Sequence, residues 1–311
     1  MSQYLQQTRR EFKGQYKYSV DCDKIKTDPN ALQVLDGSVR AKHTMIINAV
    51  VKENSGKIVV KIGKSNDIVK QEYDVAIKLE KLEGFIKMHC LFSCYNNANF
   101  SNINDPININ DFEVCQPKHT SNVDVLIMPY INKGQTINDY LESGIEPAEY
   151  KKILKQVISN LYNAFVKTGF VHKDLHFGNI LIDEKNDPII MDFDTSEFNK
   201  IQGFFWADLQ RLFGNVTEKS YPSNKKSYII SGISGIQILL NTIMFIKSSD
   251  ELFHKNVNEL LSILEASNVS VLDNTKKPTK YNPDLFGGKN KTRKKHPRII
   301  LPHFKVSKTK G

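Results

Sequence analysis

Residues 172–182 read His-Lys-Asp-Leu-His-Phe-Gly-Asn-Ile-Leu-Ile, and after a polar turn residues 189–194 read Ile-Ile-Met-Asp-Phe-Asp. The two short apolar runs in this stretch are typical of strands, and polar residues stand directly before the first and directly after the second. Asp174 lies five residues before Asn179, and Asp192 follows thirteen residues after Asn179. The stretch therefore predicts two polar loops, each with an acid, joined by a pair of strands.

These polar residues are the types that phosphoryl transfer requires. A carboxylate orients the attacking hydroxyl and accepts its proton, and oxygen ligands hold the Mg²⁺ that bridges the phosphates of ATP. We therefore interpret Asp174 as the catalytic base and Asn179 and Asp192 as ligands of Mg²⁺ or Mn²⁺. The alternative is an ordinary polar loop between a helix and a hairpin.

Hydrophobic periodicity predicts a β-rich region upstream of this stretch. β-Branched runs at residues 44–51 and 57–62, separated by Glu-Asn-Ser-Gly, predict a hairpin. Residues 67–82 then carry apolar side chains at helical spacing. A short apolar run at residues 123–128 predicts a strand, and Pro129 ends its ladder.

Helices are predicted on both sides of the polar stretch. Residues 149–168 follow the i, i+3, i+4, i+7 pattern throughout, and Gly169 ends the helix. Residues 228–246 are the most apolar part of the chain, but serines, glycines, Gln237 and Asn241 interrupt them. This segment favours a buried helix over a membrane span. The Asn-rich residues 96–110 predict a loop insertion.

This order of elements and residues resembles the protein kinase-like superfamily, whose signature is H-x-D-x-x-x-x-N followed by D-F-G. The resemblance covers residues from about 31 to 270 and is strongest from 168 to 194. It implies an α+β, two-lobed fold with a small β-rich N-lobe over a helical C-lobe. The implied parts are an N-terminal extension (1–30), the N-lobe and hinge (31–131), the C-lobe (132–270) and a basic flexible tail (271–311).

The resemblance also implies roles for residues of the N-lobe and the hinge. Lys61 matches the strand lysine that neutralises the α- and β-phosphates of ATP, and Glu72 in the next helix would pair with it. Met128 matches the residue that limits access to the adenine pocket, and the backbone of Tyr130 and Ile131 would bond the adenine. Taken singly, Lys61 and Glu72 have a plain alternative as solvated charges.

Three further residues enter through the same match. Lys78 in Val-Ala-Ile-Lys is rejected as the phosphate lysine, because it lies within a helix and leaves no following helix to supply a partner. His172 would brace the catalytic loop, or equally be an ordinary core histidine. Asp208 resembles the C-lobe aspartate that ties the loop down, with a surface acid as the alternative.

The chain departs from the protein-kinase pattern at several positions. Gly37 is the sole glycine of the phosphate loop, which puts backbone cradling of ATP in doubt. His176 stands where Ser/Thr kinases carry a lysine, and Asp-Leu-His-x-Gly-Asn is similar to aminoglycoside and choline phosphotransferases. Asp194 replaces the glycine that follows Asp192-Phe193 in the family, which costs backbone freedom at a hinge where glycine permits φ > 0. Sixteen residues separate Asp192 from Asp208, which leaves little room for an activation segment.

The resemblance therefore implies a kinase, with a protein Ser/Thr kinase as the leading interpretation. A small-molecule kinase acting on another hydroxyl acceptor is the rival, favoured by the short segment and the Asp-Leu-His-x-Gly-Asn loop. A pseudokinase scaffold is the rival outside enzymes, suggested by the degenerate glycine loop. Retention of both metal ligands with Lys61 and Asp174 argues against a dead site.

Charge is concentrated at the C-terminus. The chain of 311 residues has a net charge of +9, yet residues 276–311 carry +11 and the rest carries −2. This tail is similar to basic stretches in Ser/Thr kinases of large nucleocytoplasmic DNA viruses, which favours a viral origin with the host cytoplasm or the virion as location. It predicts contact with nucleic acid or another acidic surface, or else a solubility or localisation segment.

The four cysteines, Cys22, Cys90, Cys94 and Cys115, show no C-x-x-C pair and no disulfide framework, and the N-terminus shows no apolar signal core. We expect buried free thiols in a reducing, intracellular and cytoplasmic setting, without a membrane partner. A metal site using His89, Cys90 and Cys94 is the less favoured alternative, because no fourth ligand recurs nearby.

Overall fold

The computed structural model describes residues 20–35, 39–40, 44–64, 68–96, 113–116, 118–119, 121–131, 135–217, 226–231, 233–244 and 248–273. They lie within a compact unit that spans Met1–Thr275. Gly37 and almost all of the Asn-rich segment fall outside the described residues. The predictions made for them therefore stay predictions.

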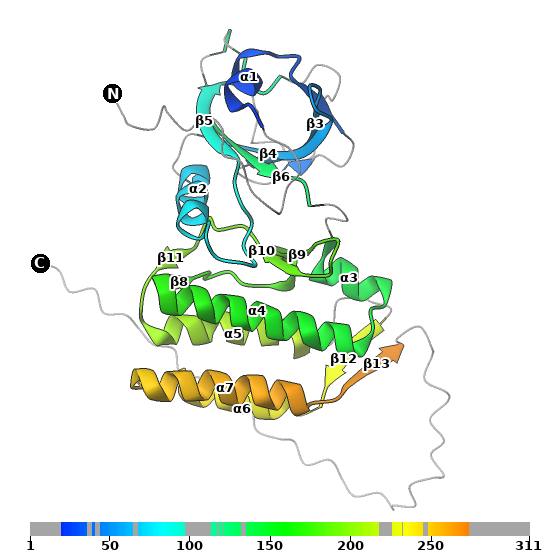
Figure 1. Cartoon of the computed structure of the whole chain (residues 1–311), viewed down its shortest axis with the longest axis vertical. Coiled ribbons are helices and arrows are strands. Elements are labelled where there is room, and N and C mark those ends of the chain that lie inside the picture. The colour runs from blue at the N-terminus through cyan, green and yellow to red at the C-terminus, as the bar shows by residue number, and fades with distance from the viewer. Residues whose placement is uncertain are drawn as a thin grey trace, which may run out of the picture. The chain divides into compact units, whose positions relative to one another are not determined.

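The first half of this unit is built on one antiparallel sheet (Figure 1). Its strands run in the order β1-β3-β4-β6-β5, with β2 paired to β3. Along β3 every second residue is buried, as expected for a strand with one face on a core. The elements are α1 (Cys22–Thr27), β1 (Leu32–Val34), β2 (Val39–Arg40), β3 (Thr44–Val51), β4 (Gly56–Lys64), α2 (Ile68–Lys78), β5 (Cys90–Tyr95) and β6 (Asn122–Pro129).

The predicted hairpin and strand are confirmed. β3 pairs with β4 in register from Thr44 opposite Gly63 to Val51 opposite Gly56, and β4 pairs with β6. Pro129 is the last paired residue of β6, as its missing N–H leads one to expect. The helix predicted for residues 67–82 is four residues shorter at its C-terminal end, because α2 stops at Lys78.

The short helix α1 belongs to the N-lobe rather than to a separate extension. Val20, Ile25 and Ala31 are buried in the same core as the inward side chains of β3 and β4. A disulfide joins Cys22, the first residue of α1, to Cys90 on β5, and a second joins Cys94 to Cys115. The prediction that residues 1–30 form an extension is therefore wrong from Val20 onward.

The disulfides also correct the prediction of buried free thiols. All four cysteines are paired, over sequence separations of 68 and 21 residues. No local spacing motif reveals partners that only the sheet brings together. The cysteine pattern consequently gives no support to a reducing compartment, and the thiol ligands imagined beside His89 are engaged elsewhere.

The second half of the unit is mainly helical (Figure 1). Its central helix buries one continuous apolar stripe and ends where Gly169 adopts φ +77°, as predicted. The elements are β7 (Gln135–Thr136), α3 (Ile137–Ser143), α4 (Pro147–Thr168), β8 (Phe170–Val171), the 3₁₀ helix η2 (Phe177–Asn179), β9 (Ile180–Ile182), β10 (Pro188–Ile190), β11 (Glu197–Phe198), α5 (Gln202–Thr217), β12 (Lys226–Ile230), α6 (Ile233–Ile243), α7 (Asp250–Ala266) and β13 (Val269–Asp273).

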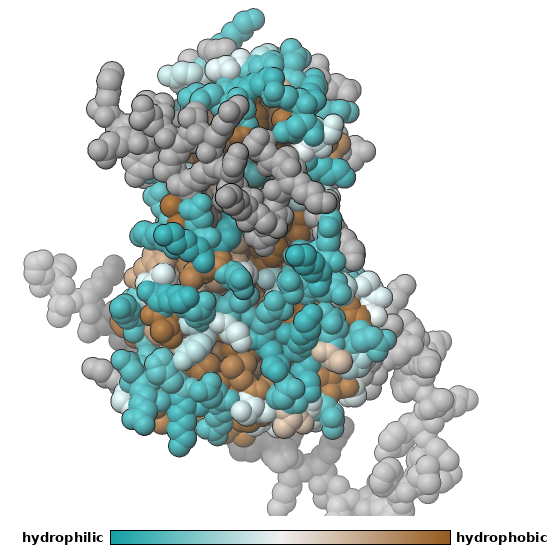
Figure 2. All heavy atoms as spheres, in the orientation of Figure 1, coloured by the Kyte–Doolittle hydropathy of each residue, from teal (hydrophilic) through white to brown (hydrophobic). Residues whose placement is uncertain are grey.

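α4 packs against α5 and α7, and Figure 1 shows α6 beside α7 at the end of the unit far from β3. Aromatic rings fill the space between these helices, with Phe205 lying 5.3 Å from both Phe165 and Phe253 between ring centroids. Figure 2 shows that the visible face over these helices is mostly hydrophilic, with hydrophobic residues in small separate patches. None of the helices that the structure describes is long and apolar enough to cross a bilayer.

Two predictions for the end of the unit need correction. The apolar residues 228–246 begin as strand β12, and the helix α6 starts only at Ile233. β-Branched residues favour the strand, and its partner β13 lies almost forty residues later in the chain. β13 runs to Asp273, so the boundary predicted after residue 270 cuts through a strand.

The two lobes meet through the segment that follows α2. Ile86 N–H donates to Ile190 O at 2.9 Å, and Ile190 N–H donates to Gly84 O at 2.8 Å. Gly84 has φ +77°, and a Cβ there would lie 1.8 Å from Asn160 Nδ2 on α4, so only glycine fits. This contact holds the end of β10, and with it Asp192, close to α2 and Glu72.

Candidate active site

Three charged side chains from both lobes form a chain of ion pairs. Lys61 on β4 places Nζ 2.6 Å from Glu72 Oε2 on α2 and 2.9 Å from Asp192 Oδ1, just after β10. Lys61 and Glu72 are buried, whereas the Asp192 side chain is 38% exposed. The structure thus contains the predicted Lys61–Glu72 pair and extends it to a carboxylate at the surface of the site.

This arrangement makes Lys61 a fixed cation. Burial alone lowers the pKa of Lys61, but the charges of Glu72 and Asp192 outweigh burial and raise this pKa above its usual value. Burial raises the pKa of the Glu72 carboxyl, and Lys61 opposes that rise. A permanent positive charge held by buried partners suits the neutralisation of phosphate oxygens.

Lys78, the rejected alternative, lies at the last residue of α2. Its Nζ is 4.5 Å from the centroid of the Phe198 ring. It is exposed and does not line the pocket that contains Lys61. The choice of Lys61 over Lys78 therefore agrees with the geometry.

Asp208 on α5 shapes the loop that carries Asp174. Its carboxylate accepts hydrogen bonds from the backbone N–H of His172 at 2.6 Å and of Lys173 at 2.8 Å. Lys173 has φ +67°, a left-handed conformation that a non-glycine residue adopts only when neighbouring groups hold it there. Asp208 is buried, so it is a structural tie for the loop rather than a surface acid.

His172 braces the same loop from the other side. Burial lowers the pKa of His172, which favours the neutral ring. Its Nε2 lies 2.9 Å from the carbonyl oxygen of Met191 and therefore carries the proton. This bond ties the catalytic loop to the residue immediately before Asp192.

Asp174 precedes the 3₁₀ helix η2, and Asn179 is the last residue of that helix. Asn179 is buried and its Nδ2 donates to Asp174 O at 3.0 Å, so Oδ1 is the atom with which it would hold a metal. The Asp174 side chain is 54% exposed, so a hydroxyl from another molecule can reach it. This geometry is compatible with an acceptor-orienting acid and an amide ligand, and these two roles stay predictions.

The residue that replaces the hinge glycine is not the strained one. Asp192 has φ +64°, whereas Asp194 is not among the residues with positive φ. The expected loss of backbone freedom at Asp194 therefore has no cost in this conformation. Burial and the neighbouring Asp192 raise the pKa of Asp194, while Lys61 lowers it.

A cavity of about 300 Å³ lies between the lobes and contains Lys61 with its two ion-pair partners, Glu72 and Asp192. Met128 and Ile131 line it as predicted, together with Pro129 and Tyr130. The N–H of Tyr130, however, donates to Lys57 O at 3.3 Å, which leaves only its carbonyl oxygen for an adenine ring. The rest of the lining, to which the sequence analysis gave no role, is Asn48 and the apolar residues Ile46, Val59, Ile86, Leu181 and Met191.

The residues at this cavity fit a Mg²⁺–nucleotide better than a metal held by protein alone. No group of three or more His, Cys, Asp or Glu side chains in the described part of the chain has the arrangement of a metal site. Asp192 commits Oδ1 to Lys61, and its other carboxylate oxygen with Asn179 Oδ1 gives two ligand atoms. Mg²⁺ at nucleotide sites takes one or two protein ligands and completes its shell with phosphates and water.

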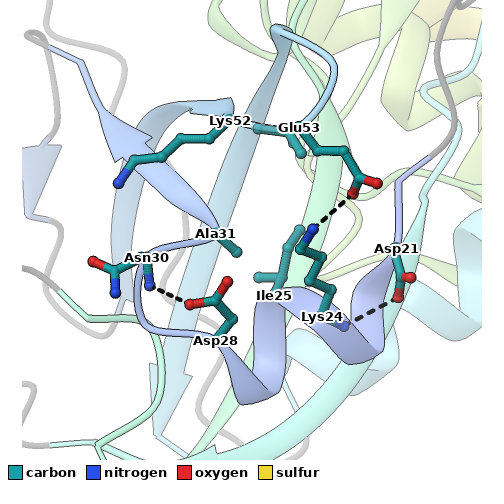
Figure 3. Close-up of a pocket in the computed structure, with 9 residues that line it drawn as sticks. Asp21, Lys24, Ile25, Asp28, Asn30, Ala31, Lys52 and Glu53 are labelled. Atoms are coloured by element: carbon teal, nitrogen blue, oxygen red, sulfur yellow. Dashed lines mark hydrogen bonds and ion pairs between the residues drawn. The ribbon is translucent and has the colours of Figure 1, made fainter.

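A second hollow, of about 240 Å³, lies between α1 and the turn after β3 (Figure 3). Lys24 Nζ reaches Glu53 across it at 3.1 Å, and Asp28 accepts from the N–H of Asn30 at 2.8 Å. It shares no lining residue with the Lys61 cavity. Lys24 and Glu53 pair with each other, and Asp21 and Asp28 accept backbone N–H groups, so the hollow adds nothing to the chemistry of the site.

Comparison with known proteins agrees with this geometry. Residues 107–227, which contain Asp174, Asn179, Asp192 and Asp208, match the model of the ABC1 atypical kinase-like domain. The match and the site together support a place in the protein kinase-like superfamily. The fold is kinase-like. Its β-sheet N-lobe, helical C-lobe and shared cavity are the predicted architecture.

Individual relatives agree with the kinase-like fold. NUAK family SNF1-like kinase 1 of Mus musculus is 28% identical over 168 residues, which is 52% of this chain and 24% of that protein. The Homo sapiens protein of the same name is 33% identical over 98 residues, which is 31% of this chain and 14% of that protein. The chain thus covers a minor part of each relative.

Proposed function

We propose that this chain is an ATP- and Mg²⁺-dependent phosphotransferase whose acceptor is a Ser or Thr hydroxyl of a protein. The observation that carries the proposal is the pair of ion pairs that Lys61 makes with Glu72 and Asp192 inside one cavity. The hinge residues Tyr130 and Ile131 line the same cavity. The similarity to proteins named SNF1-like kinase supports a protein acceptor.

Each residue has a distinct task in this proposal. Lys61 neutralises phosphate oxygens, and Glu72 keeps its ammonium group aimed into the cavity. Asn179 and Asp192 hold Mg²⁺, which supplies charge neutralisation when bound with ATP. Asp174 orients the acceptor hydroxyl and takes its proton as the new oxygen–phosphorus bond forms.

A small-molecule acceptor is the second candidate, and a specific observation favours it. The short segment from Asp192 to Asp208 contains β11, which pairs back onto β8. This short, folded-back segment offers little surface for docking a peptide. The match to an atypical kinase-like domain and the Asp-Leu-His-x-Gly-Asn loop also support this candidate. A pseudokinase scaffold is the third, although Lys61, Asp174, Asn179 and Asp192 are all present.

One experiment separates these candidates. The full chain is incubated with Mg²⁺ and γ-labelled ATP and with either protein substrates or a panel of aminoglycosides, choline and sugars. Label on Ser or Thr supports the protein kinase, and label on one small molecule supports the rival. Transfer that is the same in Asp174→Asn as in the wild type, or no transfer to any acceptor, overturns the proposal. Lys61→Met should abolish transfer, whereas Lys78→Met, its matched control, should keep activity.

A further inference from the structure

His176 has one ring nitrogen engaged in the loop and the other directed at the catalytic carboxylate. Gly178 N–H donates to His176 Nδ1 at 3.0 Å, so Nδ1 is the nitrogen without a proton. The proton therefore lies on Nε2, which is 3.8 Å from Asp174 Oδ2. Backbone contact fixes the tautomer and the direction of the ring together.

The surroundings of the ring hold this orientation. A Cβ on Gly178 would lie 2.9 Å from His176 Cε1 and 3.0 Å from Nδ1, so a side chain there would push the ring aside. The His176 and Asp174 side chains are 43% and 54% exposed, so both face the space open to an acceptor. The loop at this point is built to present the Nε2–H donor next to Asp174.

Capping of η2 alone does not explain a histidine at this position. The cap needs one acceptor at the place of Nδ1, which Asn or Asp would supply equally well. The 3.8 Å separation between Nε2 and Asp174 Oδ2 is too long for an ordinary hydrogen bond. The Nε2–H group therefore remains available for an oxygen that enters beside Asp174.

We propose that His176 is a catalytic residue whose Nε2–H donates a hydrogen bond to the phosphoryl group in transfer. This inference rests on the proposed function. In the step, the bond between the γ-phosphorus and the oxygen of the ADP leaving group breaks, and a bond from that phosphorus to the acceptor oxygen forms. The acceptor proton moves to Asp174, and His176 keeps its own proton. A preorganised donor at oxygens that gain charge is worth about 10²- to 10³-fold in rate.

Two isosteric substitutions separate the donor from the cap. His176→Asn places an amide oxygen at the position of Nδ1 and removes the donor, so it keeps the cap alone. His176→Gln places an amide N–H near the position of Nε2 and gives up the cap, so it keeps the donor alone. The inference predicts that Gln retains more function than Asn, whereas a purely structural role predicts the reverse order.

The readout is the affinity of the full chain for Mg-ADP with aluminium fluoride, a mimic of the phosphoryl group in transfer, against Mg-ADP alone. His176→Asn should weaken binding of the mimic about 10- to 100-fold and change ADP affinity less than about 3-fold. His176→Gln should recover at least half of the loss on a logarithmic scale. Equal affinity of wild type and His176→Asn for the mimic, or weaker binding by His176→Gln than by His176→Asn, would overturn the inference.

This readout does not depend on turnover. If the wild type transfers phosphate to no acceptor, the proposed function fails, and the binding order of the two variants still decides whether His176 contacts the transferring group. If transfer is found, kcat should fall in His176→Asn with little change in the KM for ATP. A rise in the KM for ATP without a fall in kcat would contradict the assignment.

Discussion

Replacing Lys61 by Met should destabilise the protein strongly, because it strands a buried carboxylate. Glu72 is 2% exposed, and its carboxylate pairs with Lys61 Nζ at 2.6 Å. Removing one partner of a buried ion pair costs about 3–5 kcal/mol in the free energy of unfolding, since the other charge stays buried without compensation. Asp192 loses the same partner, but its side chain is 38% exposed and water can solvate it.

A second substitution tests whether the stranded charge causes the loss. In Lys61→Met/Glu72→Met both charges are gone and side chains of similar volume fill the space, which is neutral or stabilising by about 1–4 kcal/mol in comparable cases. The double variant should therefore recover most of the stability lost by Lys61→Met, while phosphotransfer stays abolished in both. Lys78→Met changes an exposed residue at the end of α2, the helix that carries Glu72, and should lower the free energy of unfolding by less than about 1 kcal/mol.

Urea denaturation followed by circular dichroism gives the three free energies from the midpoints and slopes. The denaturation should be read at the same pH, 7.5, for every variant. A loss below about 1 kcal/mol in Lys61→Met would refute the buried pair. A double variant as unstable as the single one would show that the loss comes from packing of the lysine stem and not from Glu72.

Three further predictions address other parts of the molecule. Burial lowers the pKa of His89 from 6.5 to about 4. Between these pH values the unfolded chain binds a proton that the folded protein does not. The free energy of unfolding should therefore fall by about 1.4 kcal/mol for each pH unit from pH 6.5 down to pH 4. Urea midpoints in His89→Gln should depend less on pH in that window, and an unchanged slope would exclude His89 as the cause. Thiol titration of the unreduced, denatured chain should find no free cysteine, and reduction should lower stability by about 2–4 kcal/mol in the wild type but not in a variant with all four cysteines replaced by serine. A chain ending at Thr275 should keep activity toward a small substrate and lose a salt-sensitive affinity for nucleic acid that we propose for the basic tail, whereas undiminished binding by the truncated chain would contradict the proposal.

The sequence pattern of a short segment was sufficient to predict those helices and strands that depend only on residues within that segment. The β3–β4 hairpin follows from two β-branched runs and a turn, and the end of α4 follows from Gly169. The disulfide from Cys22 to Cys90 and the pairing of β12 with β13 depend on contacts between distant parts of the chain. The residue pattern of one segment does not show which distant segment it will contact. The disulfide was therefore predicted wrongly, and the pairing of β12 with β13 was missed.

The site shows the same division. Motif spacing led to Lys61, Glu72 and Asp192, which the structure brings within ion-pair distance. Spacing did not reveal that the N–H of Tyr130 is engaged by Lys57, because that bond joins the hinge to a neighbouring strand. It also placed the backbone strain at Asp194 rather than at Asp192, since the pattern identifies a glycine position but not the φ that the folded loop adopts.

The measurement that tests the central claim most directly is transfer of the γ-phosphoryl group in wild type, Asp174→Asn and Asp192→Asn, with Mg-ATP affinity determined in parallel. Asp174→Asn should bind Mg-ATP nearly as tightly as the wild type and turn over about 10²- to 10⁴-fold more slowly, because only activation of the hydroxyl is lost. Asp192→Asn should instead weaken the Mg²⁺-dependent part of ATP binding, because a charged ligand is lost. Near wild-type turnover in Asp174→Asn, or unchanged Mg-ATP affinity in Asp192→Asn, would contradict the account of this site.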